Sequence, residues 1–260
     1  MSEGIAAVFE RLARPSLVEL ASVRELHTWL EDKRCCRQSC RVIGESGTGK
    51  SVACEAYHLL HPPRMVPGAL PQVPVCLLQA PREADGQGCL LALLRALGYP
   101  LTPPSLAEVR ERVVEQLQSV EVEMLILDGA QRLHYSTFAE LVDLSERVSV
   151  AIVLVGTPVL ETLLRRDEQV WNRLLVCFRF SRLTAEQLAQ TSTVWEEQVL
   201  RLSAPSHLSS PTMQKVLLPV TLGLLSTLDA LLREAAMRGL RKGQAQIDLA
   251  TLLQVASEYQ

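Results

Sequence analysis

Hydrophobic residues along this chain follow two patterns that alternate. Short apolar runs, each about the length of a buried strand, cover residues 40–43, 75–78, 123–127, 151–155 and 174–180. Between most of these runs, apolar residues return every three or four positions, which is the spacing of an amphipathic helix. Strands that alternate with helices in this way predict an α/β fold, in which a parallel sheet is covered by helices on both faces.

Glycine and proline mark the ends of the predicted helices. The helices that follow or separate the strands cover residues 52–60, 89–97, 106–119, 138–148 and 159–164. The first of them stops at His61-Pro62-Pro63, and a connection rich in proline and glycine at 62–74 leads to the second strand. Ahead of the first strand, residues 5–33 predict two helical segments that separate at Pro15.

The pattern changes near residue 183, where alternating strands and helices give way to helices alone. We therefore predict two domains: an α/β domain with an N-terminal helical lead-in at residues 1–183, and a small all-helical lid domain at residues 184–260. Leucines repeat at helical spacing in the second domain, at Leu224, Leu228, Leu231 and Leu232. We interpret them as the core of that domain in preference to a groove for a partner.

The composition agrees with a compact globular protein. The chain has 260 residues, of which 48% are hydrophobic and 21% are charged, and this is enough for a sizeable core. Its longest apolar runs are strand-sized, well short of the roughly 20 residues that a membrane-spanning helix requires. The start of the chain lacks the basic and apolar segments of a signal peptide. We expect a cytoplasmic protein with no membrane partner.

The net charge argues against nucleic-acid binding driven by overall charge, and the cysteine spacing argues against a zinc site. The net charge of −3 does not attract nucleic acid, so DNA binding would need a local patch, built mainly from arginine because lysine is scarce. The seven cysteines follow no zinc-binding spacing, and the cluster of Cys35, Cys36 and Cys40 has no histidine near it in sequence. We assign no metal site to the cysteines and interpret most of them as small buried residues.

The most informative motif lies between the first predicted strand and the helix that follows it. It reads Gly44-Glu45-Ser46-Gly47-Thr48-Gly49-Lys50-Ser51, a complete phosphate-binding loop. The glycines allow the backbone to turn tightly, so that successive amide N–H groups point at phosphate oxygens. Lys50 would reach the β- and γ-phosphates, and the Ser51 hydroxyl would bind Mg²⁺. We therefore predict a protein that binds ATP together with Mg²⁺.

A second part of such a site follows the strand at 123–127. Asp128 ends this strand, and its carboxylate would hold Mg²⁺ through water or through Ser51. The next residue is Gly129, where P-loop ATPases of the AAA+ type usually carry a glutamate that activates the attacking water. Because glycine has no side chain, we predict firm binding and impaired hydrolysis. Gln131 could still orient a water, and Glu45 is a further candidate, so weak hydrolysis stays open.

Two more polar residues fit roles around a bound nucleotide. Thr157 follows the strand at 151–155 and would place a hydroxyl beside the γ-phosphate, although it also fits a helix cap before Pro158. Arg173 would act in trans, as an arginine finger on the nucleotide of a neighbouring subunit. A solvated surface arginine describes Arg173 equally well.

These motifs together resemble the TnsC/TniB family of AAA+ transposition regulators, and most of all the short TnsC of CRISPR-associated transposons. The resemblance runs from Val18 to Tyr259 and rests on residues 44–51, 122–128, 151–157, 165–170 and 232–238. It implies a parallel AAA+ sheet with a helical lid. It also implies a nucleotide-dependent homo-oligomer, a ring or filament on double-stranded DNA. This assembly would recruit a transposase and, through a TniQ-type adaptor, link it to the target site.

The resemblance assigns roles to residues of this sequence. It implies that Lys50 and Ser51 are the phosphate and Mg²⁺ ligands, Asp128 the second acid, Thr157 the sensor and Arg173 the finger.

The chain also departs from the family pattern. Gly129 replaces the catalytic glutamate, and Thr227 stands where relatives tend to have the sensor arginine of the lid. Pro103 and Gln118 stand where relatives have lysines near the duplex, and their loss should weaken DNA binding. Arg110 and Arg112 remain as candidate DNA contacts, and they also fit a solvated helix face.

Two functions are the main candidates for these residues, and an unrelated ATPase role such as clamp loading stays open beside them. The first is an ATP-binding AAA+ regulator of DNA transposition that assembles with nucleotide on double-stranded DNA and links target selection to the transposase, with impaired hydrolysis. The second is an adaptor or scaffold that does not hydrolyse ATP and has lost DNA binding. The intact Lys50 and Ser51 favour the first, and the acidic balance favours the second.

Overall fold

The computed structural model describes residues 5–14, 16–65, 67–68, 70–99 and 105–259. These residues form two compact units. We call them the sheet unit, with Ala21–Ser46 and Lys50–Phe180, and the helical unit, with the described residues of Met1–Leu20, Gly47–Gly49 and Ser181–Gln260.

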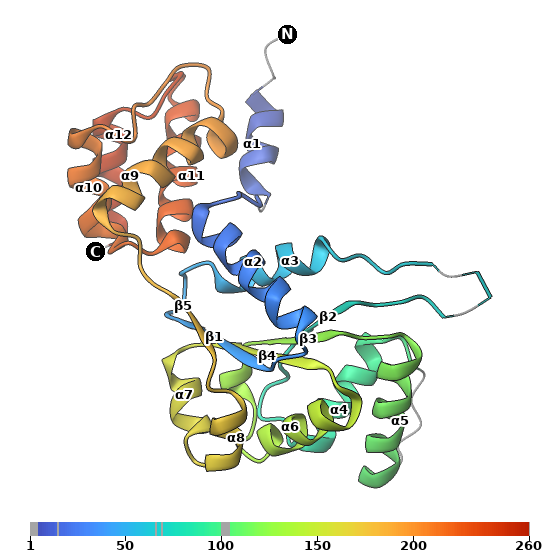
Figure 1. Cartoon of the computed structure of the whole chain (residues 1–260). Helices are drawn as coiled ribbons and strands as arrows, with labels where there is room; N and C mark the ends of the chain where they lie inside the picture. Colours follow the sequence, from blue (N-terminus) through green and yellow to red (C-terminus); the bar gives the residue numbers. More distant parts are fainter. Residues whose placement is uncertain (1–4, 15, 66, 69, 100–104, 260) are drawn as a thin grey trace. The chain divides into compact units, whose positions relative to one another are not determined.

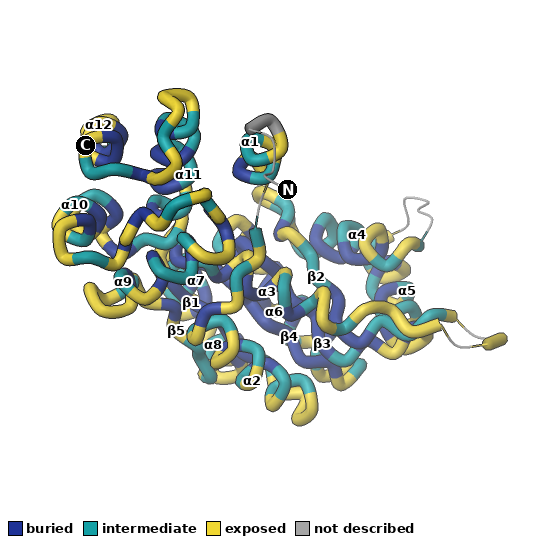
Figure 2. The backbone as a smooth tube through the Cα atoms, turned by 90° about the horizontal axis from the view of Figure 1, so that it is seen from above, coloured by how far each residue is buried: buried dark blue, intermediate teal, exposed yellow. Residues whose placement is uncertain are grey.

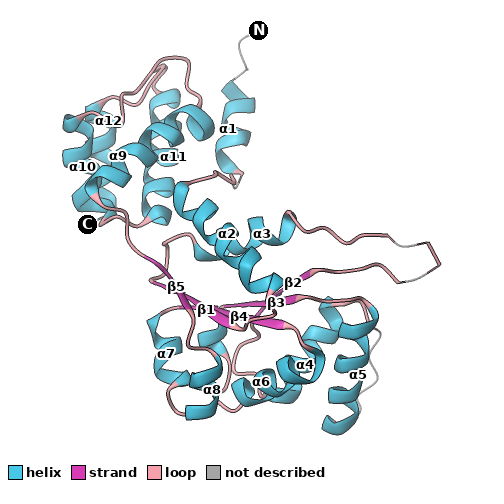
Figure 3. Ribbon diagram, viewed as in Figure 1, coloured by secondary structure: helices cyan, strands magenta, loops and turns pink. Residues whose placement is uncertain are grey.

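The sheet unit is built on one parallel sheet of five strands (Figure 3). The strands are β1 (Cys40–Gly44), β2 (Val75–Gln79), β3 (Met124–Asp128), β4 (Ala151–Gly156) and β5 (Cys177–Phe180). They lie in the order β2-β3-β4-β1-β5, and every neighbouring pair is parallel. The predicted parallel α/β sheet is therefore confirmed, and all carboxyl ends of the strands lie at one edge.

Helices cover both faces of this sheet (Figure 1). One face packs against α2 (Ala21–Cys35) and α3 (Lys50–Leu59). The other face packs against α4 (Gly86–Ala96), α5 (Leu106–Ser119), α6 (Thr137–Val148), α7 (Pro158–Leu164) and α8 (Glu168–Arg173). Alternate residues of the central strands enter the two cores, and these strands are buried along their length (Figure 2). Burial on both faces explains their continuous apolar sequence.

The helical unit contains α1 (Ile5–Ala13), α9 (Ala185–Val194), α10 (Pro211–Thr221), α11 (Leu225–Arg241) and α12 (Leu249–Ala256). A π-helical turn, Trp195–Leu200, extends α9, and a short 3₁₀ turn, Ser257–Tyr259, ends the described chain. Leu228, Leu231 and Leu232 are fully buried in its core. The three leucines therefore pack within the unit itself.

The N-terminal helix α1 belongs to the helical unit. The Arg233 guanidinium donates to the backbone carbonyls of Leu12 and Arg14, at 2.7 and 2.8 Å, and Arg11 donates to the carbonyl of Leu200 at 2.8 Å. The sequence placed this helix with the α/β domain at 1–183, whereas its packing groups it with the C-terminal helices. On the C-terminal side, the chain passes from the sheet unit to the helical unit after Phe180.

Most other differences from the predicted elements concern their ends. The predicted last strand at 174–180 is shortened to Cys177–Phe180, because Leu174 still caps α8. In the connection between α3 and β2, Arg64 and Gln72 form one antiparallel bridge, and Met65 beyond it is 82% exposed.

Among the described residues, no three His, Cys, Asp or Glu side chains come together as a metal-binding group. Cys35 and Cys36 are exposed, and burial raises the pKa of the Cys76 and Cys89 thiols to about 12. None of the helices in the described part of the chain is long and apolar enough to cross a lipid bilayer.

Candidate nucleotide-binding site

The glycine-rich loop connects the end of β1 to the start of α3. Gly47 and Gly49 have φ angles of +83° and +98°, which only glycine adopts without strain. The helix that follows begins at Lys50, so its free N–H groups and the positive end of its dipole face the loop. The chain therefore forms the strand–loop–helix context in which this motif binds phosphate, as its sequence predicts.

Lys50 is held inside this loop. Its side chain is 7% exposed, and its ammonium donates to the backbone carbonyl of Glu45 at 2.7 Å. Burial lowers the pKa of Lys50, and the charge of Asp128 offsets part of that effect. Ser51, on the first turn of α3, is exposed. A cation and a hydroxyl thus lie at the start of the helix, where the loop motif requires them.

Asp128 ends β3 and is buried to 6% exposure. Its Oδ2 atom accepts a hydrogen bond of 2.9 Å from the side-chain amide of Gln79. Gln79 ends the adjacent strand β2, and the two residues are partners in the strand register. Gln79 is absent from the site residues that the sequence predicts, because its predicted strand stops at residue 78. The available signal was its position: Gln79 is the polar residue that directly follows an apolar predicted strand, and that strand pairs with the one that Asp128 ends.

Gly129 adopts a left-handed conformation, with φ +73° and ψ +30°. A Cβ atom placed here would lie 3.3 Å from the Cζ and Nε atoms of Arg132. Gly129 has no side chain that could polarise water. Its left-handed backbone also disfavours any residue with a Cβ atom. A glutamate at position 129 would have to adopt this strained backbone conformation, which would also set the direction of its side chain.

Gln131 and Thr157 lie together at the same edge of the sheet. Gln131 belongs to a short 3₁₀ turn, Ala130–Arg132, and its Oε1 atom accepts a 3.3 Å hydrogen bond from the Thr157 backbone N–H. Within the described structure, the Thr157 hydroxyl makes no capping hydrogen bond to α7. The Gln131 amide thus links the turn after Asp128 to the end of β4, and the Thr157 hydroxyl is not used as a helix cap.

Arg173 lies at the other edge of the sheet. The segment of α7 and α8 runs from Gly156, at the carboxyl end of β4, to Cys177, at the amino end of β5, and Arg173 is the last residue of α8. Its guanidinium pairs with Glu146 at 2.7 Å, and both side chains are more than half exposed. The structure therefore separates Arg173 from the phosphate loop of its own chain.

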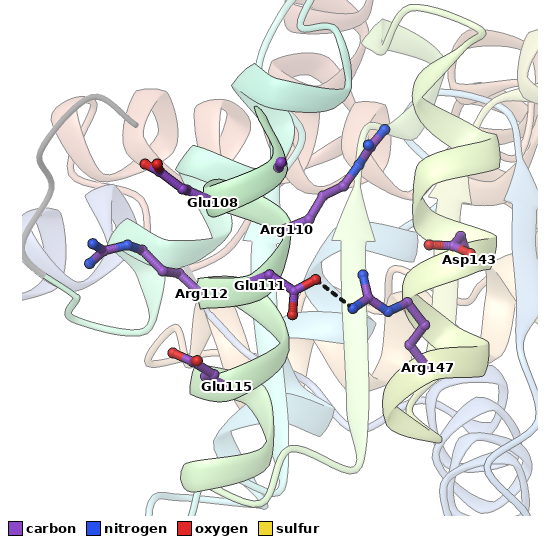
Figure 4. A pocket seen from close by; sticks show the side chains of 8 residues that line it. Glu108, Arg110, Glu111, Arg112, Glu115, Asp143 and Arg147 are labelled. Carbon is purple, nitrogen blue, oxygen red and sulfur yellow. Dashed lines mark hydrogen bonds and ion pairs between the residues drawn. The ribbon is translucent and has the colours of Figure 1, made fainter. Parts of the chain in front are cut away.

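Arg110 and Arg112 lie on α5 beside a surface pocket of about 690 Å³. The Arg110 Nε atom donates to Glu140 at 2.8 Å, and the Arg112 Nη1 atom donates to the Tyr99 hydroxyl at 2.5 Å. Figure 4 shows these arginines among acidic side chains of the pocket, namely Glu108, Glu111, Glu115 and Asp143. The charges on this surface are mixed. Gln118, on the same helix, is exposed, and Pro103 lies outside the described residues.

One family model matches the sequence of this chain. It is described as the bacterial TniB protein, and it matches residues 15–183, which is well over half of the chain. Comparison with the sequences of characterised proteins gives no significant match.

Several solved structures share the fold. The Aeropyrum pernix ORC2 protein, in complexes with ADPNP and ADP, gives a TM-score of 0.71 at 16% identity, over 97% of this chain and 71% of that chain. Cdc6p from Pyrobaculum aerophilum gives 0.73 at 15% identity, over 96% and 70%. The Aeropyrum pernix ORC1 protein in complex with DNA gives 0.67 at 18% identity, over 96% and 69%. At such identities these likenesses establish the fold, that of AAA+ P-loop proteins.

Proposed function

This chain belongs to the bacterial TniB family, and from that premise we propose that it is an ATP-binding AAA+ regulator of DNA transposition with impaired hydrolysis. The observation that carries the proposal is the complete phosphate loop beside Asp128 in a parallel AAA+ sheet. In this proposal ATP holds subunits together, and the assembly itself is the signal that links target selection to the transposase.

The residues present fit ATP with Mg²⁺. The loop at 44–49 would surround the phosphates with backbone N–H groups, and Lys50 would exchange the Glu45 carbonyl for phosphate oxygens. The Ser51 hydroxyl and the Asp128 carboxylate supply the hard oxygen ligands that Mg²⁺ prefers. Bound Mg²⁺ would neutralise phosphate charge, and Gln79 would keep the Asp128 carboxylate oriented.

Slow hydrolysis follows from the turn after β3. Position 129 provides no base, and its left-handed backbone does not favour one. Gln131 supplies an amide at the same edge, close to Thr157, and this pair is our candidate for the remaining water orientation and γ-phosphate sensing. An amide orients water without accepting its proton, so turnover would be weak.

Assembly would use both edges of the sheet unit. Arg173 lies at the edge of the sheet opposite its own phosphate loop, and this separation supports a role for it on the nucleotide of another subunit. Contacts of one edge with the opposite edge of the next copy are heterologous, and such contacts build rings or filaments. We propose such a homo-oligomer on double-stranded DNA, with transposase and a TniQ-type adaptor as partners, as in the short TnsC of CRISPR-associated transposons.

The second candidate is an adaptor that has lost DNA binding. One observation favours it: Arg110 and Arg112 donate hydrogen bonds to Glu140 and Tyr99, on a surface where arginines and acidic residues are mixed. To bind phosphate, these arginines would have to give up their present partners.

Electron microscopy with double-stranded DNA separates the two candidates. The purified protein is imaged with and without a slowly hydrolysed ATP analogue, and Lys50→Ala serves as the nucleotide-binding control. Rings or filaments on DNA that need both the analogue and Lys50 would support the regulator. Dispersed particles under every condition would favour the adaptor and would remove the basis for a finger role of Arg173.

A further inference from the structure

One buried charge in the sheet unit has no role in the nucleotide site described above. Among the described residues, the buried charged side chains are Lys50, Asp128 and Arg41. The first two belong to the phosphate site. Arg41 is 5% exposed and lies inside β1, three positions before Gly44. A buried guanidinium is costly unless its hydrogen bonds are satisfied, so its partners indicate what it does.

Three contacts of the Arg41 side chain go to the segment between β4 and β5. Its Nε atom donates to Glu161 on α7 at 3.1 Å, and its Nη1 atom donates to the backbone carbonyl of Leu174. Its guanidinium also stacks on the Trp171 ring, with Cζ 4.2 Å from the ring centroid. One side chain of β1 therefore holds this segment at three points, on α7, on α8 and at the end of α8.

Other arginines support the same partners. Arg179 on β5 donates to Glu161 at 2.8 Å, and Arg165 stacks on Trp171 with Cζ 4.0 Å from the ring centroid. Burial alone would raise the pKa of the Glu161 carboxyl, but hydrogen bonds and charges from Arg179 and Arg41 bring it below its ordinary value. Glu161 is therefore charged at neutral pH, and the cluster is a satisfied ionic network.

The position of this network relates it to the proposed arginine finger. Leu174, whose carbonyl Arg41 holds, directly follows Arg173. Thr157, the candidate γ-phosphate sensor, begins the same segment at its other end. On the other side, β1 runs from Arg41 through two residues into Gly44 of the phosphate loop. Arg41 is thus a direct connection between the strand that forms the loop and the backbone that carries Arg173.

We infer that Arg41 is a positioning residue, which sets the place of Arg173 relative to the phosphate loop of the same subunit. This inference rests on the proposed function, in which Arg173 acts on the nucleotide of the next subunit. Through Arg41, β1 of each subunit fixes the position in which that subunit presents Arg173 to the nucleotide of its neighbour. Lysine cannot replace it, because a guanidinium both stacks on an aromatic ring and donates in two directions in one plane.

The test measures the release of a fluorescent ATP analogue from the full-length protein. Wild type, Arg41→Lys and Arg173→Ala are loaded with analogue, first as dilute monomers and then as assemblies on DNA. Arg179→Met is the matched control, because it removes another partner of Glu161 from a different strand. Thermal melting confirms that each variant is folded.

We expect equal release from all monomers, because none of the substitutions touches the loop. In assemblies we expect Arg41→Lys and Arg173→Ala to release the analogue about tenfold faster than wild type, a coupling of ordinary size between sites. The double variant should release it no faster than Arg173→Ala, because both substitutions remove the same interaction. Arg179→Met should resemble wild type.

A mixing experiment shows the direction of the effect. Subunits that carry both Lys50→Ala and Arg41→Lys cannot bind nucleotide. They can affect release only through their Arg173, which contacts the nucleotide of a wild-type neighbour. Wild-type sites beside them should release analogue faster than wild-type sites beside subunits with Lys50→Ala alone. If Arg41 acted only on its own loop, the two mixtures would be identical, and the inference would be overturned.

The outcomes also separate this inference from the proposed function. If Arg173→Ala releases faster than wild type but Arg41→Lys does not, the finger stands and the role of Arg41 is overturned. If Arg173→Ala equals wild type in assemblies, the finger is wrong and the inference falls with it. Should Arg41→Lys not fold, Trp171→Leu removes the stacking surface and leaves the Arg41–Glu161 pair, and it should give the same faster release.

Discussion

The phosphate loop and the turn after β3 lie at the same edge of one sheet, but they differ in what they retain. The loop has Gly47 and Gly49 at positive φ, a buried Lys50 that donates to a loop carbonyl, and an exposed Ser51. The turn keeps Asp128 but has a left-handed glycine where a base is expected. The contrast indicates that binding and hydrolysis depend on separate pieces of backbone, so one can be lost while the other is kept.

Removal of the loop lysine should have the largest effect. Lys50→Ala deletes the one charge that we expect to contact the β- and γ-phosphates, so ATP affinity should fall at least a hundredfold, about 3 kcal/mol, as for a charged partner removed from a buried site. Titration calorimetry with the ATP analogue measures this loss. Lys33→Ala, on α2, is the control and should bind normally. Retained binding by Lys50→Ala would refute the loop as the nucleotide site.

Loss of Gln79 should have a smaller effect on the same site. Gln79→Ala removes a hydrogen bond to the charged Asp128, which corresponds to about 1.5–3 kcal/mol. We expect affinity for Mg²⁺–ATP to fall about tenfold, while affinity for ATP in the presence of EDTA changes little. Calorimetry with and without Mg²⁺ makes the comparison. An equal loss in both conditions would show that Gln79 does not act through Asp128.

A glutamate restored at position 129 should not restore hydrolysis. Gly129→Glu places a side chain on a left-handed backbone beside Arg132, so we expect a loss of about 1 kcal/mol in the free energy of unfolding and no gain in turnover. Gly129→Ala is the matched control, since it carries the backbone cost without the carboxylate. Phosphate release and thermal melting measure the two effects. A clear rise in turnover for the glutamate variant alone would mean that only the side chain was missing.

Arg110 and Arg112 should reveal how much of DNA binding, if any, depends on α5. In the regulator proposal, the double substitution to alanine should weaken DNA binding and reduce the slope of log K against log salt by up to about 2, or about 1 for each arginine that neutralises a phosphate. Fluorescence anisotropy over a range of salt concentrations gives both values. Glu111→Gln, on the same helix, is the charge-changing control. An unchanged slope would favour the adaptor.

The smallest effect concerns acid stability of the sheet unit. Hydrogen bonding from Arg34 lowers the pKa of Glu31 to about 2, against an ordinary value of 4.5. Because the folded pKa is depressed, the stabilisation is complete above pH 4.5 and is lost as pH falls toward 2. Glu31→Gln should therefore flatten the pH dependence of thermal unfolding in that range. Because Glu31 is 43% exposed, we expect the effect to be small.

The sequence determined those features that depend on neighbouring residues. Gly47, Gly49 and Lys50 form the phosphate loop because its backbone angles and its ligands come from one contiguous segment. The continuous apolar strands likewise predicted a sheet buried on both faces. The absence of a base at Gly129 was also visible, since it needs no knowledge of any distant residue.

Tertiary structure decided what depends on distant residues. Arg41 was hidden in an apolar run, and its partners Glu161 and Leu174 lie 120 and 133 positions away in the chain. The strand register brought Gln79 to Asp128, and the path of α7 and α8 carried Arg173 to the far edge of the sheet. The helix α1 joined the C-terminal helices through Arg233. Such interactions follow from which elements pack together, and a local pattern of residue types does not specify them.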